Sequence, residues 1–555
     1  MKLLSLALLV AFSSLAVQAA GPVVPSAGMI LQQVQPTPPL LPSPNETGLT
    51  IERANGAKLP PGAPFMVKLL QISGNTLFAT DTLHALIADG QAKNLTLLQI
   101  NELANRITDY YHDHDYPLAR AIIPVQTIRD GVVNIQVIEA RYNKIELNNS
   151  SPVIDSLLQA TLAPLQSGHS ISQTEMDHAL LLLSDVPGVV VLATLKPGDA
   201  VGSSDLLVNT TPGSTRSGNL VLDGYGNRYT GRDRLGGALT FINPLHHGDT
   251  LTVNGLSSGG GMNYGRLAYE SLLNGMGTRL GGSHSTLHYV LGEPMDALNA
   301  HGTAQVESLW TKQTLMRTRD ANMYGQVQYD GLKLTDHIDA SAIRTDRHID
   351  NWTASLTGDS RDTFLSGAVT AWNLSWTAGN VSFDDGAAQL ADASTAKTEG
   401  HFSKWNASLA RLQGLSEKNT LYIAFSGQWA STNLDSSQKT TAGGPYTVRA
   451  YDMGAVSGDS GYLLTIEFRR DLGNGWLGQW QAVAFVDLAK VEVNKNPWAS
   501  GPNEATLNGL GLGLNWSGDD QWTARIYVAA PLGPVPELVG TSNRARAWVE
   551  VAKRF

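Results

Sequence analysis

The chain has 555 residues and a formal net charge of −10, and only 16% of its residues are charged. No block of basic residues offers a footprint for phosphates, so the composition argues against a nucleic-acid binder. The chain has no cysteine, which excludes thiol catalysis, cysteine-ligated metal sites and disulfide bonds and suits passage through an oxidising compartment.

The first twenty residues predict a secretory signal peptide. Lys2 gives a positive start, Leu3–Val17 is a short apolar run, and the small residues Ala19 and Ala20 precede a break in the pattern. This run is too short to span a membrane comfortably, and no later apolar stretch reaches 18 residues. If the exported chain enters a membrane, it must therefore do so as a β-barrel.

Residues 21–64 are rich in proline and show no sustained periodicity. This composition predicts an extended linker. It leaves open whether the linker also carries a short plug or gating element.

Residues 65–140 predict an α+β unit. A strand-like run starts at Phe65, and a short helix follows it. Thr96 and Gln99 have the spacing of a capping box and predict the start of a second, amphipathic helix. Two strands, the first predicted over residues 118–128, then surround a turn.

Residues 141–213 predict a second unit of similar order. Ser151–Pro152 are predicted to cap a helix that runs through Leu162, and Ser172 with Glu175 to cap another. Two strand-like segments follow. The repetition of one topology is stronger evidence for a fold than any single element.

Residues 214–555 lack helical periodicity and consist of short alternating segments separated by Gly, Asn, Asp and Ser. For example, Trp372, Leu374 and Trp376 alternate with small or polar residues. Such a period of two, repeated many times, predicts a transmembrane β-barrel, and about 21 residues per strand and connection give about 16 strands. The alternative is a soluble all-β sandwich or propeller.

The chain ends in a strand-like segment with Phe555 as its last residue. Val549, Val551 and Phe555 share one face, which resembles the terminal signal by which outer-membrane barrels are recognised for insertion. Lys553 interrupts this face where an apolar residue is usual.

The glycine-rich stretch 443–461 is predicted to be a long connection between strands. A tight-hairpin signal at residues 473–475 places the long connection at the opposite end of the barrel, and long loops of such barrels are external. In the strand after the hairpin, alternation puts Phe485 and Asp487 on the lumen face. An arginine in the loop, Arg449, needs a carboxylate if it enters the lumen, and Asp487 can serve.

Together these features resemble the two-partner secretion transporters (TpsB, the haemolysin secretion/activation proteins). The resemblance rests on the paired α+β units, the barrel of about 16 strands, and two short motifs. The first motif lies in the long loop and consists of Val448, Arg449, Ala450 and Tyr451. The second lies two strands on and comprises Phe485 and Asp487.

The resemblance implies that residues 65–140 and 141–213 are POTRA domains in the periplasm, in front of an outer-membrane barrel. It also implies that the loop folds back into the barrel, where Arg449 meets Asp487. Ala450 and Ala489 stand where the family usually has glycine. If such a glycine takes a positive φ, an alanine there costs about 1 kcal/mol or more.

By this resemblance, the chain secretes a partner exoprotein of the haemolysin or adhesin type, whose N-terminal secretion domain binds the POTRA domains. Strand addition is the expected mode, with residues 118–128 and 189–195 as candidate edges. The pore would open by movement of the loop around Arg449, of a plug from the linker, or of both. The other expected partners are outer-membrane lipid and, during biogenesis, the barrel-assembly machinery.

No enzymatic activity, cofactor or metal is predicted, although three motifs resemble such sites. Ser460 lies in Gly-Asp-Ser-Gly, but within a barrel loop; residues 255–259 fit Gly-x-Ser-x-Gly, but lead into a strand instead of the required helix. His112–Asp115 alternate at a helix end, so they do not share a face. A barrel-assembly insertase of the same superfamily, a diffusion porin and an exported surface enzyme remain as alternatives, in that order.

Overall fold

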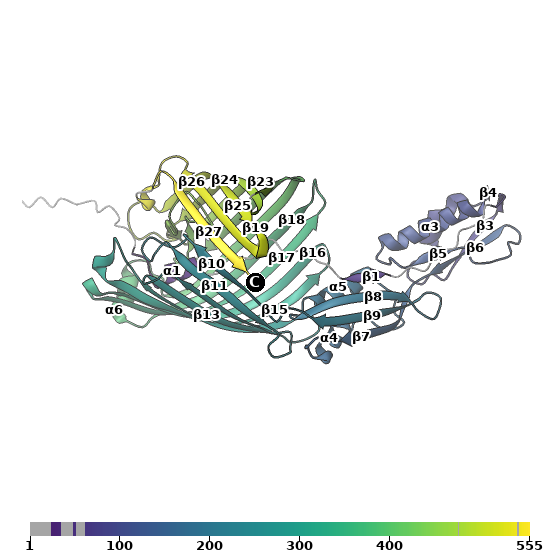
Figure 1. Ribbon diagram of the computed structural model, residues 1–555, viewed down its shortest axis with the longest axis horizontal. Coiled ribbons are helices and arrows are strands. Elements are labelled where there is room, and N and C mark those ends of the chain that lie inside the picture. Colours follow the sequence, from purple (N-terminus) through teal and green to yellow (C-terminus); the bar gives the residue numbers. More distant parts are fainter. Residues whose placement is uncertain (1–23, 35–47, 52–61, 476, 541–542) are drawn as a thin grey trace, which may run out of the picture.

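The computed structural model describes residues 24–34, 48–51, 62–475, 477–540 and 543–555. The predicted signal peptide, residues 1–20, lies outside these residues. Two small α+β domains lie in a row at one end of a barrel (Figure 1). Within the described residues, no helix combines the length and apolarity that crossing a membrane would require.

The first domain packs two helices on a small sheet of order β3-β6-β5, in which β3 and β6 are parallel. Thr96 and Gln99 form the predicted capping box at the start of its long helix. The expected strand over residues 118–128 is only three residues long, because Pro124 has no N–H for a ladder. The elements are β2 (Phe65–Val67), β3 (Leu69–Ser73), α2 (Thr80–Ile87), η1 (Ala88–Gly90), β4 (Lys93–Leu95), α3 (Leu97–Asp113), β5 (Arg120–Ile122) and β6 (Val132–Ile138).

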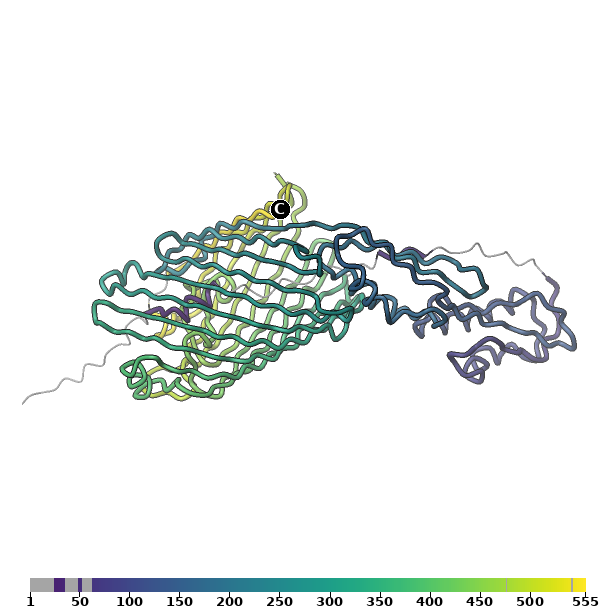
Figure 2. Tube along the Cα trace, turned by 90° about the horizontal axis from the view of Figure 1, so that it is seen from below, coloured from purple at the N-terminus to yellow at the C-terminus, as the bar shows by residue number. Residues whose placement is uncertain are grey.

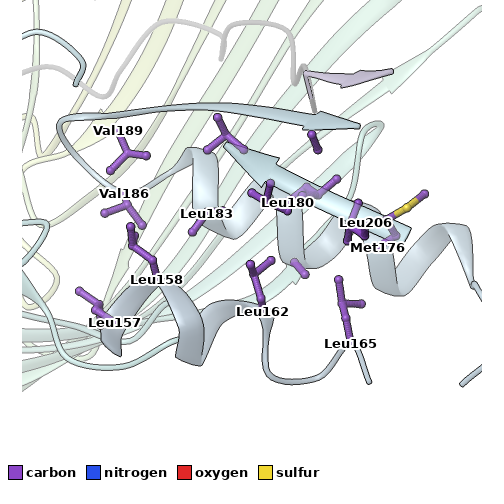
Figure 3. Packing of buried hydrophobic residues seen from close by; sticks show 14 of the residues in the cluster. Leu157, Leu158, Leu162, Leu165, Met176, Leu180, Leu183, Val186, Val189 and Leu206 are labelled. Carbon is purple, nitrogen blue, oxygen red and sulfur yellow. The ribbon is translucent and has the colours of Figure 1, made fainter. Parts of the chain in front are cut away.

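The second domain also packs two helices on a sheet, over a core of leucine and valine side chains (Figure 3). Ser172 accepts a hydrogen bond from the Glu175 N–H, as predicted. The predicted cap at Ser151–Pro152 is wrong: α4 begins at Asp155, and the Ser151 hydroxyl bonds to Asn149 instead. The elements are β7 (Arg141–Asn149), α4 (Asp155–Leu162), α5 (Gln173–Ser184), β8 (Val189–Pro197) and β9 (Ser203–Pro212).

A piece of the proline-rich linker completes this second sheet. Strand β1 (Leu49–Ile51) pairs in parallel with β8, and Leu49 lies opposite Ala193. The sheet order is therefore β1-β8-β9-β7. Of the two edges predicted to accept a substrate strand, β8 is covered by β1, whereas β5 pairs only with β6 among the described strands.

A buried hydrogen-bond network around Glu139 fixes the end of the first domain, next to the start of the second. The Glu139 carboxylate accepts hydrogen bonds from the backbone N–H groups of Thr76 (2.7 Å) and Leu77 (2.8 Å) and from the Tyr111 hydroxyl (2.8 Å). From the second domain, Arg141 reaches the Thr76 hydroxyl (2.9 Å). Burial alone would raise the pKa of Glu139, but the hydrogen bonds from Thr76, Leu77 and Tyr111 outweigh it, so this pKa lies below its ordinary value.

The second domain is fastened to the barrel rim by ion pairs. The Arg317 guanidinium binds both oxygens of Asp185, at 2.7 and 2.8 Å. Arg319 binds Asp177 of α5 at 2.7 Å. Arg279 donates to the Asp185 carbonyl at 2.7 Å. These contacts hold the end of α5 against the strand ends of the barrel.

The barrel is closed and has 16 antiparallel strands, which confirms the predicted architecture and excludes the sandwich and the propeller. It closes where β10 pairs with β27. Trp376 and Leu374 point outward, each 41% exposed, as the alternation predicts. The strands are β10 (Arg216–Asp223), β11 (Arg234–Ile242), β12 (Thr250–Ser257), β13 (Met262–Leu272), β14 (Arg279–Val290), β15 (Ala300–Arg317), β16 (Ala321–Ile338), β17 (Ile343–Asp362), β18 (Ala368–Phe383), β19 (Gly400–Ser416), β20 (Asn419–Ala430), β23 (Ser460–Gly475), β24 (Gly478–Glu492), β25 (Glu504–Ser517), β26 (Trp522–Pro531) and β27 (Arg546–Arg554).

Short elements lie in the connections: η2 (Asp296–Leu298), η3 (Asp339–Ser341), α6 (Gly386–Ser394), β21 (Thr440–Ala442), β22 (Val456–Gly458), η4 (Asp519–Gln521) and η5 (Glu537–Val539). The longest connection runs from residue 431 to residue 459, and so it starts earlier than predicted. The predicted tight turn at 473–475 lies inside β23, because the ladder with β24 continues, past an irregularity at Asp471/Gly473, to Gly475.

We expect Glu139→Gln to destabilise the first α+β domain by about 1–3 kcal/mol at neutral pH, because it weakens a buried hydrogen-bond network. A carboxyl whose pKa is lowered on folding stabilises the protein above its unfolded pKa of about 4.3 and loses this effect as the pH falls through the folded pKa. The difference between variant and wild type should therefore shrink in acid. Urea unfolding of residues 65–213, followed by circular dichroism at several pH values, measures it.

The exposed strand carboxylate Glu146, changed to Gln, is the matched control and should leave the unfolding curve unchanged. A Glu139→Gln variant with wild-type stability at pH 7 would show that the network does not stabilise the first domain.

Candidate functional site: the filled barrel lumen

A helix from the linker lies inside the barrel, near the end away from the α+β domains (Figure 2). This helix, α1 (Ala27–Val34), contacts β14, β15 and β16. Ala27, Ile30, Leu31 and Val34 are buried among apolar side chains of the barrel wall. The composition of the linker left open whether it carries a plug. Eight of its residues lie in the lumen.

Polar contacts fix the N-terminal end of α1 to the wall and to the long loop. The Ala27 N–H donates to Asp336 at 2.7 Å, and the Ser26 and Ser436 hydroxyls are 2.8 Å apart. Arg347 binds Asp336 at 2.7 Å and Asp435 of the loop at 2.5 Å. The buried Arg347 guanidinium therefore links Asp336, the wall residue that binds α1, to Asp435 near the start of the loop.

The loop of residues 431–459 folds back into the lumen against the other wall. Val448, Ala450 and Tyr451 are buried, together with Phe485 and other side chains of β24 to β26. The tip of the loop is therefore packed like a protein core instead of being solvated.

Arg449 lies at the centre of this packing and is 4% exposed. Its guanidinium binds both oxygens of Asp487, with Nε to Oδ2 at 2.9 Å and Nη2 to Oδ1 at 2.8 Å. Its backbone N–H also donates to Asp487 (3.1 Å), and its carbonyl accepts from the Trp548 indole (2.7 Å). The structure thus brings together the two charged residues that the sequence paired.

A second carboxylate completes the site. Arg449 Nη1 binds Glu467 Oε1 at 2.6 Å, and Arg469 binds the other oxygen of Glu467 at 2.6 and 2.8 Å. Two arginines thus face two carboxylates, and the cluster is neutral. A buried charge needs such complete pairing, because removal of one partner leaves an uncompensated ion.

Glycines of β25 make room for the loop tip and for the ring beneath Arg449. The Phe485 ring centroid is 3.4 Å from the guanidinium carbon of Arg449, a cation–π contact. A Cβ at Gly511 would lie 2.3 Å from this ring, and a Cβ at Gly509 would lie 2.6 Å from that of Ala450. The alternate glycines of β25 are therefore part of the site.

Neither Ala450 nor Ala489, both within the described residues, has a positive φ. The strain considered for alanine at these positions therefore does not arise. Ala450 packs over Gly509, and Ala489 lies in the regular ladder between Leu463 and Leu507.

The residues of the three motifs that resemble catalytic or metal sites make structural hydrogen bonds. Ser460 begins β23 and bonds to the Ala430 N–H at 3.2 Å, and Ser258 bonds to the Thr230 carbonyl in a hairpin between β12 and β13. At the end of α3, His112 and His114 bond to backbone carbonyls, and Asp115 accepts hydrogen bonds from Ser172 and Thr174 of the second domain.

Phe555 follows β27 and exchanges backbone hydrogen bonds with Gly218 of β10, at 2.8 and 3.0 Å. Its side chain is 55% exposed, and a Cβ at Gly218 would lie 2.7 Å from its ring. Lys553, which interrupts the apolar pattern, lies over the Trp522 ring and reaches the Asp520 carbonyl. The final residue therefore sits at the seam where the barrel closes.

The sequence analysis missed Glu467, Trp548, Arg347 and the glycines of β25. Glu467 alternates with the apolar residues Ile466 and Phe468 in the sequence, so alternation gave a signal for it. Gly509 and Gly511 alternate with leucine in the sequence, which also marks them as one face. Arg347 had no comparable signal, because its partners Asp336 and Asp435 lie on another strand and in the loop.

Comparisons with known proteins agree with this architecture. Residues 202–516 match the family model described as haemolysin secretion/activation protein ShlB/FhaC/HecB, and residues 65–140 match that of the ShlB-type POTRA domain. The heme/hemopexin transporter protein HuxB of Haemophilus influenzae (strain 86-028NP) is 27% identical over 486 residues, which cover 87% of this chain and 85% of that protein.

Solved structures share the fold. CdiB from Escherichia coli superposes with a TM-score of 0.71 at 20% identity, over 91% of this chain and 93% of that one. BamA from Haemophilus ducreyi, lacking POTRA domains 1–3, gives a TM-score of 0.52 at 14% identity, over 88% and 100% of the two chains.

These matches settle what kind of barrel this is. A POTRA domain precedes a 16-stranded barrel, and the family model covers more than half of the chain. The barrel lies in the outer membrane and the POTRA domains lie in the periplasm. The chain belongs to the haemolysin secretion/activation protein family, the outer-membrane transporters that secrete a partner exoprotein in two-partner secretion.

Proposed function

We propose that this transporter recognises an extended segment of its exoprotein by strand addition to the POTRA domains, and that recognition is linked to removal of α1 from the lumen. The observation that carries the proposal is that one linker reaches both places. Strand β1 occupies the β8 edge and α1 occupies the lumen, with only residues 35–48 between them.

The strand edges support this mode of recognition. An extended segment offers unpaired backbone groups, which an exposed sheet edge can bind. Strand β5 pairs with a strand on one side only among the described strands, so a segment can add there once the Ala121 N–H leaves the Thr108 hydroxyl of α3, to which it donates at 3.0 Å. The β8 edge can accept one only if β1 leaves, and a segment that binds there competes with the linker.

The lumen contacts support a gate of two parts. Helix α1 is held by Asp336, by Ser436 and by a hydrogen bond from the Gln32 amide to the Lys439 carbonyl (2.5 Å). Two of these three partners belong to the loop that carries Arg449. Departure of α1 therefore removes contacts from the loop, and movement of the loop loosens α1.

The outer surface fits contact with outer-membrane lipid. Trp376, Trp405 and Trp429 point outward, between 41% and 50% exposed, from neighbouring strands in one ladder row. Such rows form the aromatic girdles at membrane interfaces. Phe555 at the seam is the feature that we propose the barrel-assembly machinery recognises during biogenesis.

We expect Thr50→Pro to strengthen binding of the exoprotein's secretion domain by up to about tenfold if it uses the β8 edge, because a competing strand is removed. Thr50→Ala keeps the backbone N–H and is the matched control. Titration of the purified full-length transporter with the secretion domain measures the affinity. Unchanged binding in Thr50→Pro would exclude the β8 edge, and weaker binding in Ala121→Pro would then favour β5.

We expect Gly28→Val to release α1, because a Cβ at Gly28 would lie 2.6 Å from Ser436 and Ser437. The variant should show a larger single-channel conductance than wild type in planar bilayers. Gly386→Val, in the first turn of α6, is the control, because no atom lies within 4 Å of a Cβ there. If both variants conduct like wild type, α1 does not limit the pore.

We expect Arg449→Ala to abolish secretion of the large exoprotein co-expressed with this chain. Without the guanidinium, Asp487 and Glu467 stay buried without their main partner, which costs about 3–5 kcal/mol and detaches the loop tip. Exoprotein in the medium is measured, together with the heat-modifiable barrel in the outer membrane. Arg344→Ala, at an exposed pair with Asp346, is the control.

Normal secretion by Arg449→Ala would show that the cluster is not needed for transport. Absence of secretion by the wild-type chain, despite an inserted barrel, would contradict the transport function itself and favour the insertase or the porin.

A further inference from the structure

Between α1, the loop and the wall, the lumen contains a cavity of about 620 Å³. Leu31 and Gln32 of α1 and residues 437–441 of the loop border it on two sides. Strands β13 to β20 supply nearly all of the wall that faces it, whereas the wall from β24 to β26 is covered by the loop cluster around Arg449. The lumen therefore has one covered wall and one open wall.

A row of neutral polar side chains runs across the open wall. Each strand from β15 to β20 contributes a hydroxyl or an amide to the cavity lining: Ser308, Gln328, Asn351, Thr377, Asn406 and Gln428.

Three charged side chains of the wall also line the cavity, and each hydrogen-bonds to neutral groups: Asp330, Lys404 and Arg266, the last of which donates to the Ser283 hydroxyl at 3.2 Å. Asp330 accepts hydrogen bonds from Ser308 (2.6 Å) and Gln328 (2.8 Å). The Lys404 ammonium donates to the Gln438 carbonyl of the loop at 2.8 Å. A chain that passes along this wall would therefore meet mainly hydroxyls and amides.

We propose that this row of six side chains, from Ser308 on β15 to Gln428 on β20, is the track along which the exoprotein crosses the barrel. The proposal rests on the proposed function, and it adds which wall the exoprotein touches. The passing chain is an extended polypeptide, and the track binds its backbone N–H and C=O groups.

The chemistry of the row suits a moving chain. Hydroxyls and amides both donate and accept, so they can bind either backbone group. They are bonded to one another at rest, as between Thr353 and Thr377 (2.9 Å) and between Asn406 and Gln428 (2.8 Å). A passing chain exchanges one such hydrogen bond for another, so each contact contributes little net free energy, of about 0.5–1.5 kcal/mol.

Other wall chemistries would hinder movement. An unpaired charge in the lumen would retain oppositely charged residues of the exoprotein, and an apolar wall would retain its apolar side chains. The charged and aromatic groups of the covered wall, Arg449, Glu467, Phe485 and Tyr527, are bound to one another beneath the loop. Helix α1 borders the track through Leu31 and Gln32, so its departure uncovers the track.

Cysteine cross-linking tests the track, because the chain contains no cysteine of its own. Asn351→Cys and Thr377→Cys place a thiol on the track, and Ala505→Cys places one on β25 beneath the loop. Each full-length variant is co-expressed with the exoprotein, which carries a single cysteine and is arrested by a stably folded C-terminal fusion. External protease verifies that its N-terminal part has crossed the membrane.

We expect Asn351→Cys and Thr377→Cys to form disulfide cross-links with the arrested exoprotein. We expect Ala505→Cys to form none. Verified arrest without a cross-link at either track position would overturn the proposal while leaving the secretory function intact. A cross-link at Ala505→Cys that equals those of the track would overturn it as well, because the covered wall would then be open during transport. Absence of secretion by wild type would contradict the proposed function itself.

A second variant tests the chemistry of the track. Asn351→Leu combined with Asn406→Leu keeps the approximate side-chain volume but removes the exchangeable hydrogen bonds. We expect slower secretion at unchanged barrel levels in the membrane. An unchanged rate of secretion would show that the polar chemistry of the row does not assist passage.

Discussion

A closed barrel of 16 strands encloses more space than its own wall side chains can fill, and barrels of this size leave an aqueous channel. The other features of this lumen follow from that constraint. The transporter must close the channel at rest with segments that do not belong to the wall, and it must be able to move them. Helix α1 and the loop of residues 431–459 are those segments, and they are about 400 residues apart in the sequence.

The two segments are fixed in different ways. Helix α1 packs an apolar face against the wall. It also makes a few hydrogen bonds, with Asp336, Ser436 and Lys439. The loop tip is fixed by a neutral cluster of two arginines and two carboxylates, which is packed among aromatic rings and glycines. Buried ion pairs add little stability over apolar packing, but they penalise every arrangement in which one partner is missing. Such a cluster suits a loop that must keep one register.

Much of this could be predicted from the sequence because strands and helices leave periodic patterns. A period of two predicted the barrel, the shared face of Leu374 and Trp376, which point outward, and the inward position of Asp487. The N-cap residues Thr96 and Ser172 located two helix starts to the residue. In each case, the signal lies within one element or one turn of the chain.

The features that could not be predicted depend on contacts between distant segments. Helix α1 has only eight residues in a proline-rich region, and its apolar face has meaning only against the barrel wall. Strand β1 has three residues and exists because β8 offers an edge. Arg347 joins a strand to a loop 88 residues away, so no local pattern marks it.

The asymmetry of the lumen follows from the placement of these contacts. The residues that bind Arg449 at the loop tip, Asp487, Glu467 and Trp548, lie on the last strands of the barrel, after the loop in sequence. The residues that pack against α1 lie mainly on the preceding strands. One half of the wall is therefore covered by a loop from the same segment of chain. The other half faces a helix from the N-terminal linker, which apolar packing and a few hydrogen bonds hold. This second half also carries the row of hydroxyls and amides, so the same division that closes the channel determines where it can open.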